Sequence, residues 1–228
     1  MERRLEIAHQ LARVKAELNT ATHFPVPKLI VVTKTFPLSD VEILYELGQR
    51  DFGENRDQEG SIKSQGVPED SIWHFQGAIQ SNKIKSIVKW SDYIHSLDDL
   101  GHARKISEVA LGLSKRQKCF IQINLDPPQI TASGIQAARS GIKQSELESF
   151  AAELKKLAGI EVVGVMGVGP LGQDPAPAFA LLKTLSIKLQ GLIPGAEFIS
   201  AGMSGDYKVA LQHGATHIRL GSSILGSR

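Results

Sequence analysis

Short apolar segments alternate with helical segments along almost the whole chain, and this alternation restricts the fold more than any other feature. Eight segments are short and rich in β-branched or aromatic residues, as buried strands are: residues 29–33, 51–53, 72–75, 93–95, 119–123, 162–165, 197–199 and 217–220. Such alternation is typical of a parallel sheet, and eight parallel strands close a barrel. The sequence therefore predicts an α/β fold, a TIM-type (β/α)8 barrel.

The two ends of the chain complete this prediction. Residues 1–19 are predicted to form an amphipathic helix, because Ile7, Leu11, Val14 and Leu18 fall on one helical face. Only six residues follow Ser222, which is too few for an eighth helix of ordinary length. We expect the N-terminal helix to pack on the barrel in place of that last helix, with residues 1–228 forming a single domain. The alternative is an open doubly wound sheet, which needs fewer strands.

Charge and cysteine content exclude several functional classes. The 26 Lys and Arg residues are scattered and nearly balanced by 24 Asp and Glu residues, so no nucleic-acid or membrane surface is predicted. Cys119 is the only cysteine, which excludes an internal disulfide and a multi-cysteine zinc site. The histidines show no metal-ligand spacing. We therefore expect no metal. Because no membrane-spanning run and no signal peptide are visible, we also expect a cytoplasmic protein.

Candidate site residues follow from the barrel, whose active site lies at the carboxyl ends of the strands. Two candidates, His74 and Arg219, lie within predicted strands close to that end. The others follow their strands directly and are Lys34, Asn55, Met166, Ser200, Met203, Ser204, Gly221 and Ser222. Small residues and single polar groups dominate this set, which favours a small, polar, anionic ligand.

The loops after the seventh and eighth strands indicate a phosphate. Gly202 and Gly205 flank Met203 and Ser204, and Gly221 precedes Ser222. Glycines let backbone N–H groups approach an anion closely, and barrels commonly bind phosphate in these two loops. The alternative is that the glycines only make tight turns.

Lys34 ends the apolar run Val31-Val32-Thr33 and has two interpretations. One is an ordinary surface lysine whose apolar stem lies along the protein. The other is a lysine that forms a Schiff base, which requires a neutral amine; burial in an apolar barrel mouth would lower its pKa and supply one. Three other candidates keep simpler alternatives: a core histidine for His74, a helix cap for Asn55, and a paired buried cation for Arg219.

Several motifs along the chain together resemble a known family. They are Val31-Val32-Thr33-Lys34, Phe52-Gly53-Glu54-Asn55, Trp73-His74-Phe75-x-Gly77-x-x-Gln80-x-Asn82-Lys83, Gly164-Val165-Met166, Ser200-x-Gly202-Met203-Ser204-x-Asp206 and Arg219-x-Gly221-Ser222-x-Ile224-x-Gly226. In this order and spacing they are similar to the YggS/PROSC family of pyridoxal phosphate homeostasis proteins. Two differences are Gln76, where the family usually has an apolar residue, and the segment 126–141, which includes Arg139 and is longer than usual.

The resemblance implies the fold of the N-terminal barrel of bacterial alanine racemase without its second, β-rich domain. It implies that Lys34 carries pyridoxal 5′-phosphate (PLP) as an internal aldimine. Phosphate contacts would come from Ser200, Met203, Ser204, Gly221 and Ser222. Arg219 would face the pyridine nitrogen, Asn55 and His74 would line the ring, and Met166 would lie beside the cofactor.

The implied function is a carrier and buffer of PLP rather than an enzyme. An arginine beside the pyridine nitrogen keeps that nitrogen unprotonated, which weakens the ring as an electron sink. A racemase also needs two opposed bases, and Tyr45, Tyr93 and Tyr207, the only tyrosines, do not fall on strand-end loops over the ring. We expect a monomer that delivers PLP to apo PLP enzymes. The alternatives are a PLP-dependent racemase or other low-activity PLP enzyme, and a Schiff-base aldolase or phosphosugar enzyme.

Overall fold

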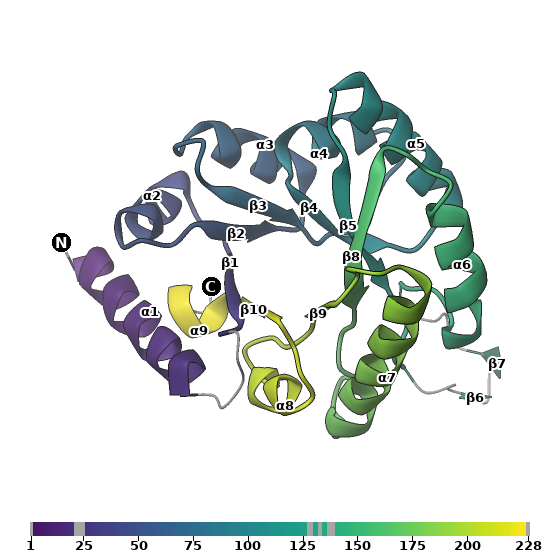
Figure 1. The fold of residues 1–228 in the computed structure, drawn as a ribbon. Coiled ribbons are helices and arrows are strands. Elements are labelled where there is room, and N and C mark those ends of the chain that lie inside the picture. Colours follow the sequence, from purple (N-terminus) through teal and green to yellow (C-terminus); the bar gives the residue numbers. More distant parts are fainter. Residues whose placement is uncertain (1, 21–25, 127–129, 132–133, 136–139, 227–228) are drawn as a thin grey trace.

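Eight parallel strands of the described chain close into a barrel (Figure 1). The structure is a computed structural model and describes residues 2–20, 26–126, 130–131, 134–135 and 140–226. The barrel strands are β1 (Lys28–Val32), β2 (Asp51–Glu54), β3 (Ile72–Phe75), β4 (Tyr93–Leu97), β5 (Gln117–Gln122), β8 (Ile160–Met166), β9 (Phe198–Ser200) and β10 (His217–Leu220). Strand β1 pairs with β2 on one side and with β10 on the other, which closes the barrel. The predicted fold is confirmed, and the open sheet is excluded.

Helices surround the barrel, as Figure 1 shows. They are α1 (Glu2–Thr20), α2 (Leu38–Glu46), α3 (Asp57–Gln65), α4 (Ile84–Trp90), α5 (Leu100–Gly112), α6 (Leu147–Leu154) with a preceding 3-10 turn η1 (Gln144–Glu146), α7 (Ala176–Leu192), α8 (Tyr207–Gln212) and α9 (Ser222–Leu225). A two-stranded hairpin, β6 (Ile130–Thr131) and β7 (Gly134–Ile135), lies in the segment 126–141. Most of that segment, including Arg139, lies outside the described residues. No helix that the structure describes is long and apolar enough to cross a membrane.

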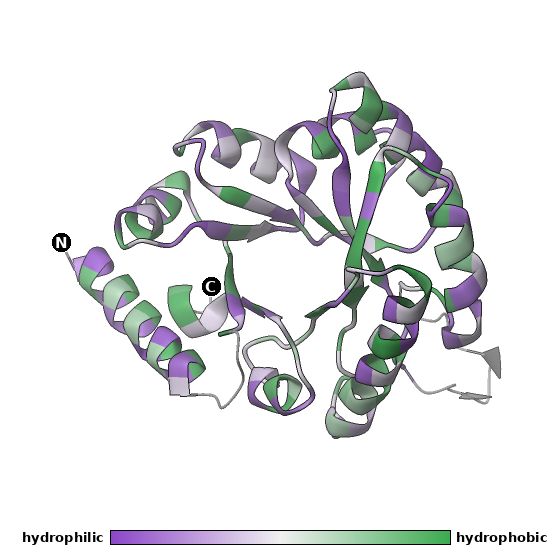
Figure 2. Ribbon diagram, in the orientation of Figure 1, coloured by the Kyte–Doolittle hydropathy of each residue, from purple (hydrophilic) through white to green (hydrophobic). Residues whose placement is uncertain are grey.

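The chain after β10 does form a helix, but only the single short turn α9. Helix α1 packs against α9 and against α2 (Figure 1), so it covers the gap that a full-length last helix would fill. The predicted face of α1 is buried, since Ile7, Leu11, Val14 and Leu18 are at most 3% exposed. Figure 2 agrees with this amphipathic character, because hydrophobic and hydrophilic residues alternate along α1.

The inside of the barrel is unusually polar. Barrel interiors are normally filled by branched aliphatic side chains. Here the His217 ring from β10 lies 5.3 Å from the Phe120 ring of β5 and 6.4 Å from the His74 ring of β3. The His95 ring of β4 stacks on Phe120 at 4.3 Å. Rings from strands that are not neighbours can meet only across the interior, which places His217 and His74 inside the barrel. His95 also lies inside, because its ring bonds Ser200 of β9, which is not a neighbour of β4.

The three interior histidines make the fold sensitive to acid. Burial lowers the pKa of His74 and His95 and lowers the pKa of His217 to about 3. In the unfolded chain these side chains take up protons near pH 6.5, whereas in the folded chain they stay neutral. Below that pH the unfolded state therefore binds more protons, and the free energy of unfolding falls as pH falls. Each such histidine contributes up to about 1.4 kcal/mol per pH unit.

We expect His217→Leu to reduce this pH dependence, because it removes one group that must stay neutral to remain buried. The measurement is the free energy of unfolding from urea titrations between pH 7 and pH 4. The slope should fall by about 1.4 kcal/mol per pH unit in the lower half of that range. His9→Leu, on the exposed side of α1, is the matched control. Equal slopes in His217→Leu and the unsubstituted protein would contradict the prediction.

Candidate functional site

Closure of the barrel brings the candidate residues from both halves of the chain to one edge. Val31 pairs with Leu220, and Val32 pairs with Gly53. Lys34 therefore follows β1 between the loop that begins at Gly221 and the loop that begins at Asn55. The Lys34 side chain is exposed, so the expectation that apolar neighbours bury its amine is wrong.

The backbone on both sides of Lys34 is held by a cluster of hydrogen-bonded side chains, the Lys63 cluster, made of Thr33, Glu54, Glu59 and Lys63. Lys63 Nζ donates to Glu54 Oε1 at 2.7 Å, to the Thr33 carbonyl at 2.8 Å and to Glu59 Oε2 at 3.3 Å. Thr33 Oγ1 donates to Glu54 Oε1 at 2.6 Å. The Thr35 N–H donates to Glu59 Oε2 at 2.7 Å. Each neighbour of Lys34 is thus bonded to a carboxylate that Lys63 also holds.

Three members of the Lys63 cluster are buried, Glu59 is half-buried, and the backbone beside the cluster is strained at Thr35. Glu54 is fully buried and Lys63 is 5% exposed. Burial raises the pKa of Glu54 against the opposing effects of Lys63 and Thr33. Thr35 has a φ of 67°, a left-handed conformation that β-branched residues rarely adopt. Such a conformation persists where the surroundings determine it, which the bond from Thr35 to Glu59 does.

The loops after β9 and β10 are joined by side-chain hydrogen bonds. Ser222 Oγ donates to Ser204 Oγ at 3.0 Å, and the Ser223 N–H donates to the same oxygen at 3.4 Å. Gly202 has a φ of 93°, and a Cβ there would lie 2.8 Å from the Tyr207 Cα, so only glycine fits. The two glycine loops therefore form one surface of backbone and hydroxyl groups beside Lys34.

Arg219 places a cation beneath these loops. Its Nη1 donates to Ser200 Oγ at 2.8 Å and its Nη2 donates to the Gly167 carbonyl at 3.2 Å. The side chain is buried, and burial lowers its pKa to about 10, which still leaves it charged at neutral pH. Met166, at the end of β8, is also buried and packs with Phe120.

Two residues that are predicted to contact the ligand, His74 and Ser200, form hydrogen bonds within the barrel interior. Both ring nitrogens of His74 are bonded inside the barrel, Nδ1 to His95 and Nε2 to Asp51, which agrees with the alternative of a core histidine. The Ser200 hydroxyl bonds Arg219 and His95. Ligand contacts by His74 and Ser200 stay predictions. Arg56, not Asn55, is the N-cap residue of α3, so the cap alternative for Asn55 is wrong.

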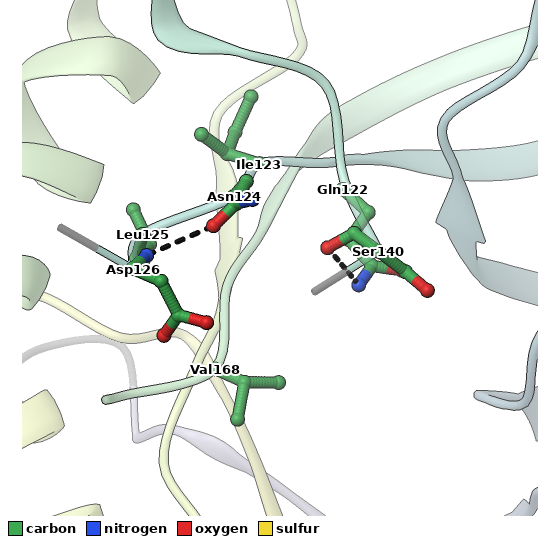
Figure 3. A pocket seen from close by; sticks show the side chains of 7 residues that line it. All are labelled: Gln122, Ile123, Asn124, Leu125, Asp126, Ser140 and Val168. Atoms are coloured by element: carbon green, nitrogen blue, oxygen red, sulfur yellow. Dashed lines mark hydrogen bonds between the residues drawn. The ribbon is translucent and has the colours of Figure 1, made fainter. Parts of the chain in front are cut away.

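A pocket of about 410 Å³ opens at the carboxyl ends of β5 and β8 (Figure 3). Its lining residues are Gln122, Ile123, Asn124, Leu125, Asp126, Ser140 and Val168. None of them is among the residues predicted to bind a ligand, although Asp126 and Ser140 lie in the segment 126–141 that differs from the family. The pocket lies at the end of the barrel where the candidate site is predicted.

The donors at this edge suit a small anionic ligand. Gln76 Nε2 is buried and has no hydrogen-bond partner within the described part of the chain. It occupies the space beside Gly53, where a Cβ would lie 2.9 Å from it. A buried donor without a partner indicates a missing water or ligand. Together with Arg219 and the hydroxyls of Ser204 and Ser222, it forms a set of donors to which an anionic ring compound with a phosphate fits.

Comparisons with known proteins agree with this chemistry. The family model described as the N-terminal domain of alanine racemase matches residues 6–228. A protein of Synechocystis named "Pyridoxal phosphate homeostasis protein" is 38% identical over 91% of this chain and 94% of its own length. The chain belongs to the family of pyridoxal phosphate homeostasis proteins. The family resemblance that the motifs indicated is thereby confirmed.

Solved structures confirm the fold. PipY of Synechococcus elongatus PCC7942, solved with PLP bound, is 32% identical and superimposes with a TM-score of 0.84 over 96% of this chain and 100% of its own. Alanine racemase of Corynebacterium glutamicum superimposes with a TM-score of 0.75 at 14% identity. The superposition includes 97% of this chain but only 60% of that racemase. The racemase therefore supports the barrel fold alone.

Sequence reasoning missed Glu59, Lys63 and the interior partners His95 and Asp51, and it named Thr33 and Glu54 only as motif residues. The alternation within Asp51–Glu54 was the available signal, because it places Asp51 and Glu54 on opposite faces of one strand. Lys63 gave no signal, because a lysine in a polar helix is ordinarily exposed.

We expect Lys63→Met to destabilise the fold by about 3–5 kcal/mol, because it leaves Glu54 buried without its cation. The measurement is the free energy of unfolding by urea titration at neutral pH. Lys208→Met is the matched control, since Lys208 forms an exposed ion pair with Glu17 and should contribute at most about 1 kcal/mol. Similar losses in the two variants would show that the Lys63 cluster has no special role.

Proposed function

We propose that this protein binds PLP through a Schiff base at Lys34 and serves as a cytoplasmic carrier and buffer of PLP. The observation that carries the proposal is the placement of one exposed lysine, with its backbone held on both sides, beside two joined glycine loops and above a buried arginine. The PLP-bound PipY relative supports the choice of ligand. We further propose that it acts as a monomer and that apo forms of PLP enzymes accept the cofactor.

PLP supplies an aldehyde that condenses reversibly with primary amines and a pyridine ring that can stabilise negative charge. The Lys34 amine would add to the aldehyde carbon, and loss of one water would leave a C=N bond. This exchange needs no oxidant and no further reactant. The exposed position of Lys34 gives incoming aldehydes and departing cofactor direct access.

The remaining candidates would bind the two ends of the cofactor. The joined loops would hold the phosphate through Gly221, Ser222, Met203 and Ser204, since backbone N–H groups and hydroxyls donate to phosphate oxygens. Ser200 is the fifth phosphate residue that the family resemblance implies.

The pyridine ring would be held from the other side of the site. Arg219 would donate to the ring nitrogen, and Asn55, His74 and Met166 would lie around the ring. Because Arg219 stays charged, the ring nitrogen would stay unprotonated and the ring would be a weak electron sink.

The tyrosines argue against racemase activity. A racemase needs a second base on the face of the ring opposite the lysine. Tyr207 donates to Glu17 at 2.5 Å, and its burial raises its pKa to about 12. Tyr93 stacks on His74 inside the barrel, and Tyr45 donates to Asp70 on the outer surface. All three tyrosines are thus engaged in hydrogen bonds or ring contacts of their own, which supports the proposal that none of them serves as the second base.

We expect Lys34→Ala to abolish the imine absorbance of bound PLP and to weaken PLP binding without abolishing it, because the phosphate contacts remain. The measurement is an absorbance titration with PLP, followed by borohydride reduction and peptide mapping. Reduction should label the Lys34 peptide of the unsubstituted protein. Lys188→Ala, at an exposed ion pair on α7, is the matched control. A label on another lysine, or no imine band at all, would overturn the proposed function.

We expect the PLP-loaded protein to exchange the Cα proton of L- or D-alanine in D₂O no faster than free PLP does. The reason is that the three tyrosines are engaged elsewhere, so no tyrosine is proposed as a second base opposite Lys34, and the ring would be a weak electron sink. Proton NMR of alanine measures the exchange. Exchange at least 100-fold above free PLP would instead favour a PLP-dependent racemase or another low-activity PLP enzyme.

A further inference from the structure

A chain of hydrogen-bonded side chains crosses the barrel interior from its amino-terminal end to Arg219. The histidine chain consists of Asp51, His74, His95 and Ser200. Asp51 Oδ1 lies 3.0 Å from His74 Nε2, and His74 Nδ1 lies 2.9 Å from His95 Nε2. His95 Nδ1 lies 2.8 Å from Ser200 Oγ, which in turn accepts from Arg219 Nη1 at 2.8 Å. Four strands, β2, β3, β4 and β9, supply its members.

The chemistry of its members gives the histidine chain a single direction. A carboxylate only accepts hydrogen bonds, so His74 Nε2 carries the proton that bonds Asp51. Neutral His74 then accepts at Nδ1, which requires that His95 donates from Nε2. Neutral His95 in turn accepts at Nδ1, so the Ser200 hydroxyl donates to it. The Ser200 oxygen is thereby left as an acceptor for Arg219.

The charges around the histidine chain support this direction. Lys28 Nζ lies 3.0 Å from Asp51 Oδ1, and the pKa of Asp51 is lowered because His74 and Lys28 together outweigh its burial. Burial lowers the pKa of His74 and of His95, and Arg219 and His217 further disfavour a charged His95. His74 and His95 are both fully buried, with no exposed surface. Both imidazoles therefore stay neutral at physiological pH.

Arg219 depends on this arrangement for one of its two acceptors. Its guanidinium is fixed by Ser200 Oγ and by the Gly167 carbonyl. His95 accepts the hydrogen bond from the Ser200 hydroxyl and so fixes its rotation, which directs the oxygen lone pairs toward the guanidinium. Without an acceptor for its proton the hydroxyl could rotate, and the lone pairs would no longer be held toward Arg219. The orientation of Arg219 is thus coupled to a carboxylate on the opposite end of the barrel.

We propose that Asp51, His74 and His95 are positioning residues that hold Arg219 toward the bound cofactor through Ser200. The proposal rests on the proposed function, because it takes PLP to be the ligand that Arg219 faces. None of these three residues needs to contact PLP in order to orient Arg219. Their role is to fix which N–H groups of Arg219 remain for the ring nitrogen.

The first experiment needs no cofactor. Long-range proton–nitrogen NMR of the ¹⁵N-labelled protein, at pH 7, distinguishes the two nitrogens of each imidazole. We expect His74 and His95 both to be protonated at Nε2 and bare at Nδ1. In Asp51→Asn the amide can also donate, so we expect part of His74 and His95 to convert to the Nδ1-protonated form. The opposite tautomer in the unsubstituted protein would overturn the proposal.

The second experiment measures the PLP dissociation constant and the absorbance maximum of bound PLP. We expect His95→Leu to raise the dissociation constant about tenfold and Asp51→Asn about threefold, both with a shifted maximum. His95→Gln should restore most of the affinity, because its amide can accept from Ser200 and donate to His74. These spectral changes would not follow from a loss of stability alone.

Two variants serve as matched controls. His217→Leu removes another buried interior histidine that has no hydrogen bond to the histidine chain, and Asp40→Asn alters a buried carboxylate that pairs with Arg3 on the outer surface. Both should keep the unsubstituted affinity and spectrum. Equal changes in the controls, or unchanged affinity and spectrum in His95→Leu and Asp51→Asn, would overturn the positioning role alone. Absence of PLP binding by the unsubstituted protein would instead show that the proposed function fails.

Discussion

The parallel pairing of β1 with β10 closes the barrel, and every feature of the candidate site depends on it. Val31 lies opposite Leu220, which brings the turn carrying Lys34 beside the loop that begins at Gly221. These residues are far apart in the sequence and come together only when the last strand returns to the first. In an open sheet β1 and β10 would lie at separate positions, and no surface would combine the lysine with the two glycine loops.

A polar interior is expensive, and its hydrogen bonding explains how this barrel tolerates one. Buried polar groups cost free energy unless they are bonded, and a buried network must be satisfied throughout to be stable. From Asp51 to Arg219 each side chain has a partner above and below it. As a consequence, no side chain of this network can change its protonation state independently of the others. The network is therefore fixed at neutral pH, whereas acid destabilises the fold.

The sequence predicted the barrel well because short β-branched or aromatic runs and helical patterns are local signals. It also located the strand-end residues, since their place follows from strand order alone. It did not predict the surroundings of Lys34 or the partners of Ser200. The burial of Lys63 depends on how α3 packs on β2 and β3, and the meeting of His95 with Ser200 depends on contact across the barrel. Neither contact leaves a pattern in a single stretch of sequence.

Strand β2 contributes no residue to the predicted set of ligand contacts, and Asn55 directly follows it, yet the strand connects the two sides of the site. Its inward residue Asp51 begins the histidine chain, whose last member Ser200 bonds Arg219. Its outward residue Glu54 belongs to the Lys63 cluster, which holds the backbone at Lys34. Alternation of side chains along a strand makes this possible, because residues three apart point to opposite faces. One four-residue strand therefore connects the backbone at Lys34 with the side-chain network that reaches Arg219.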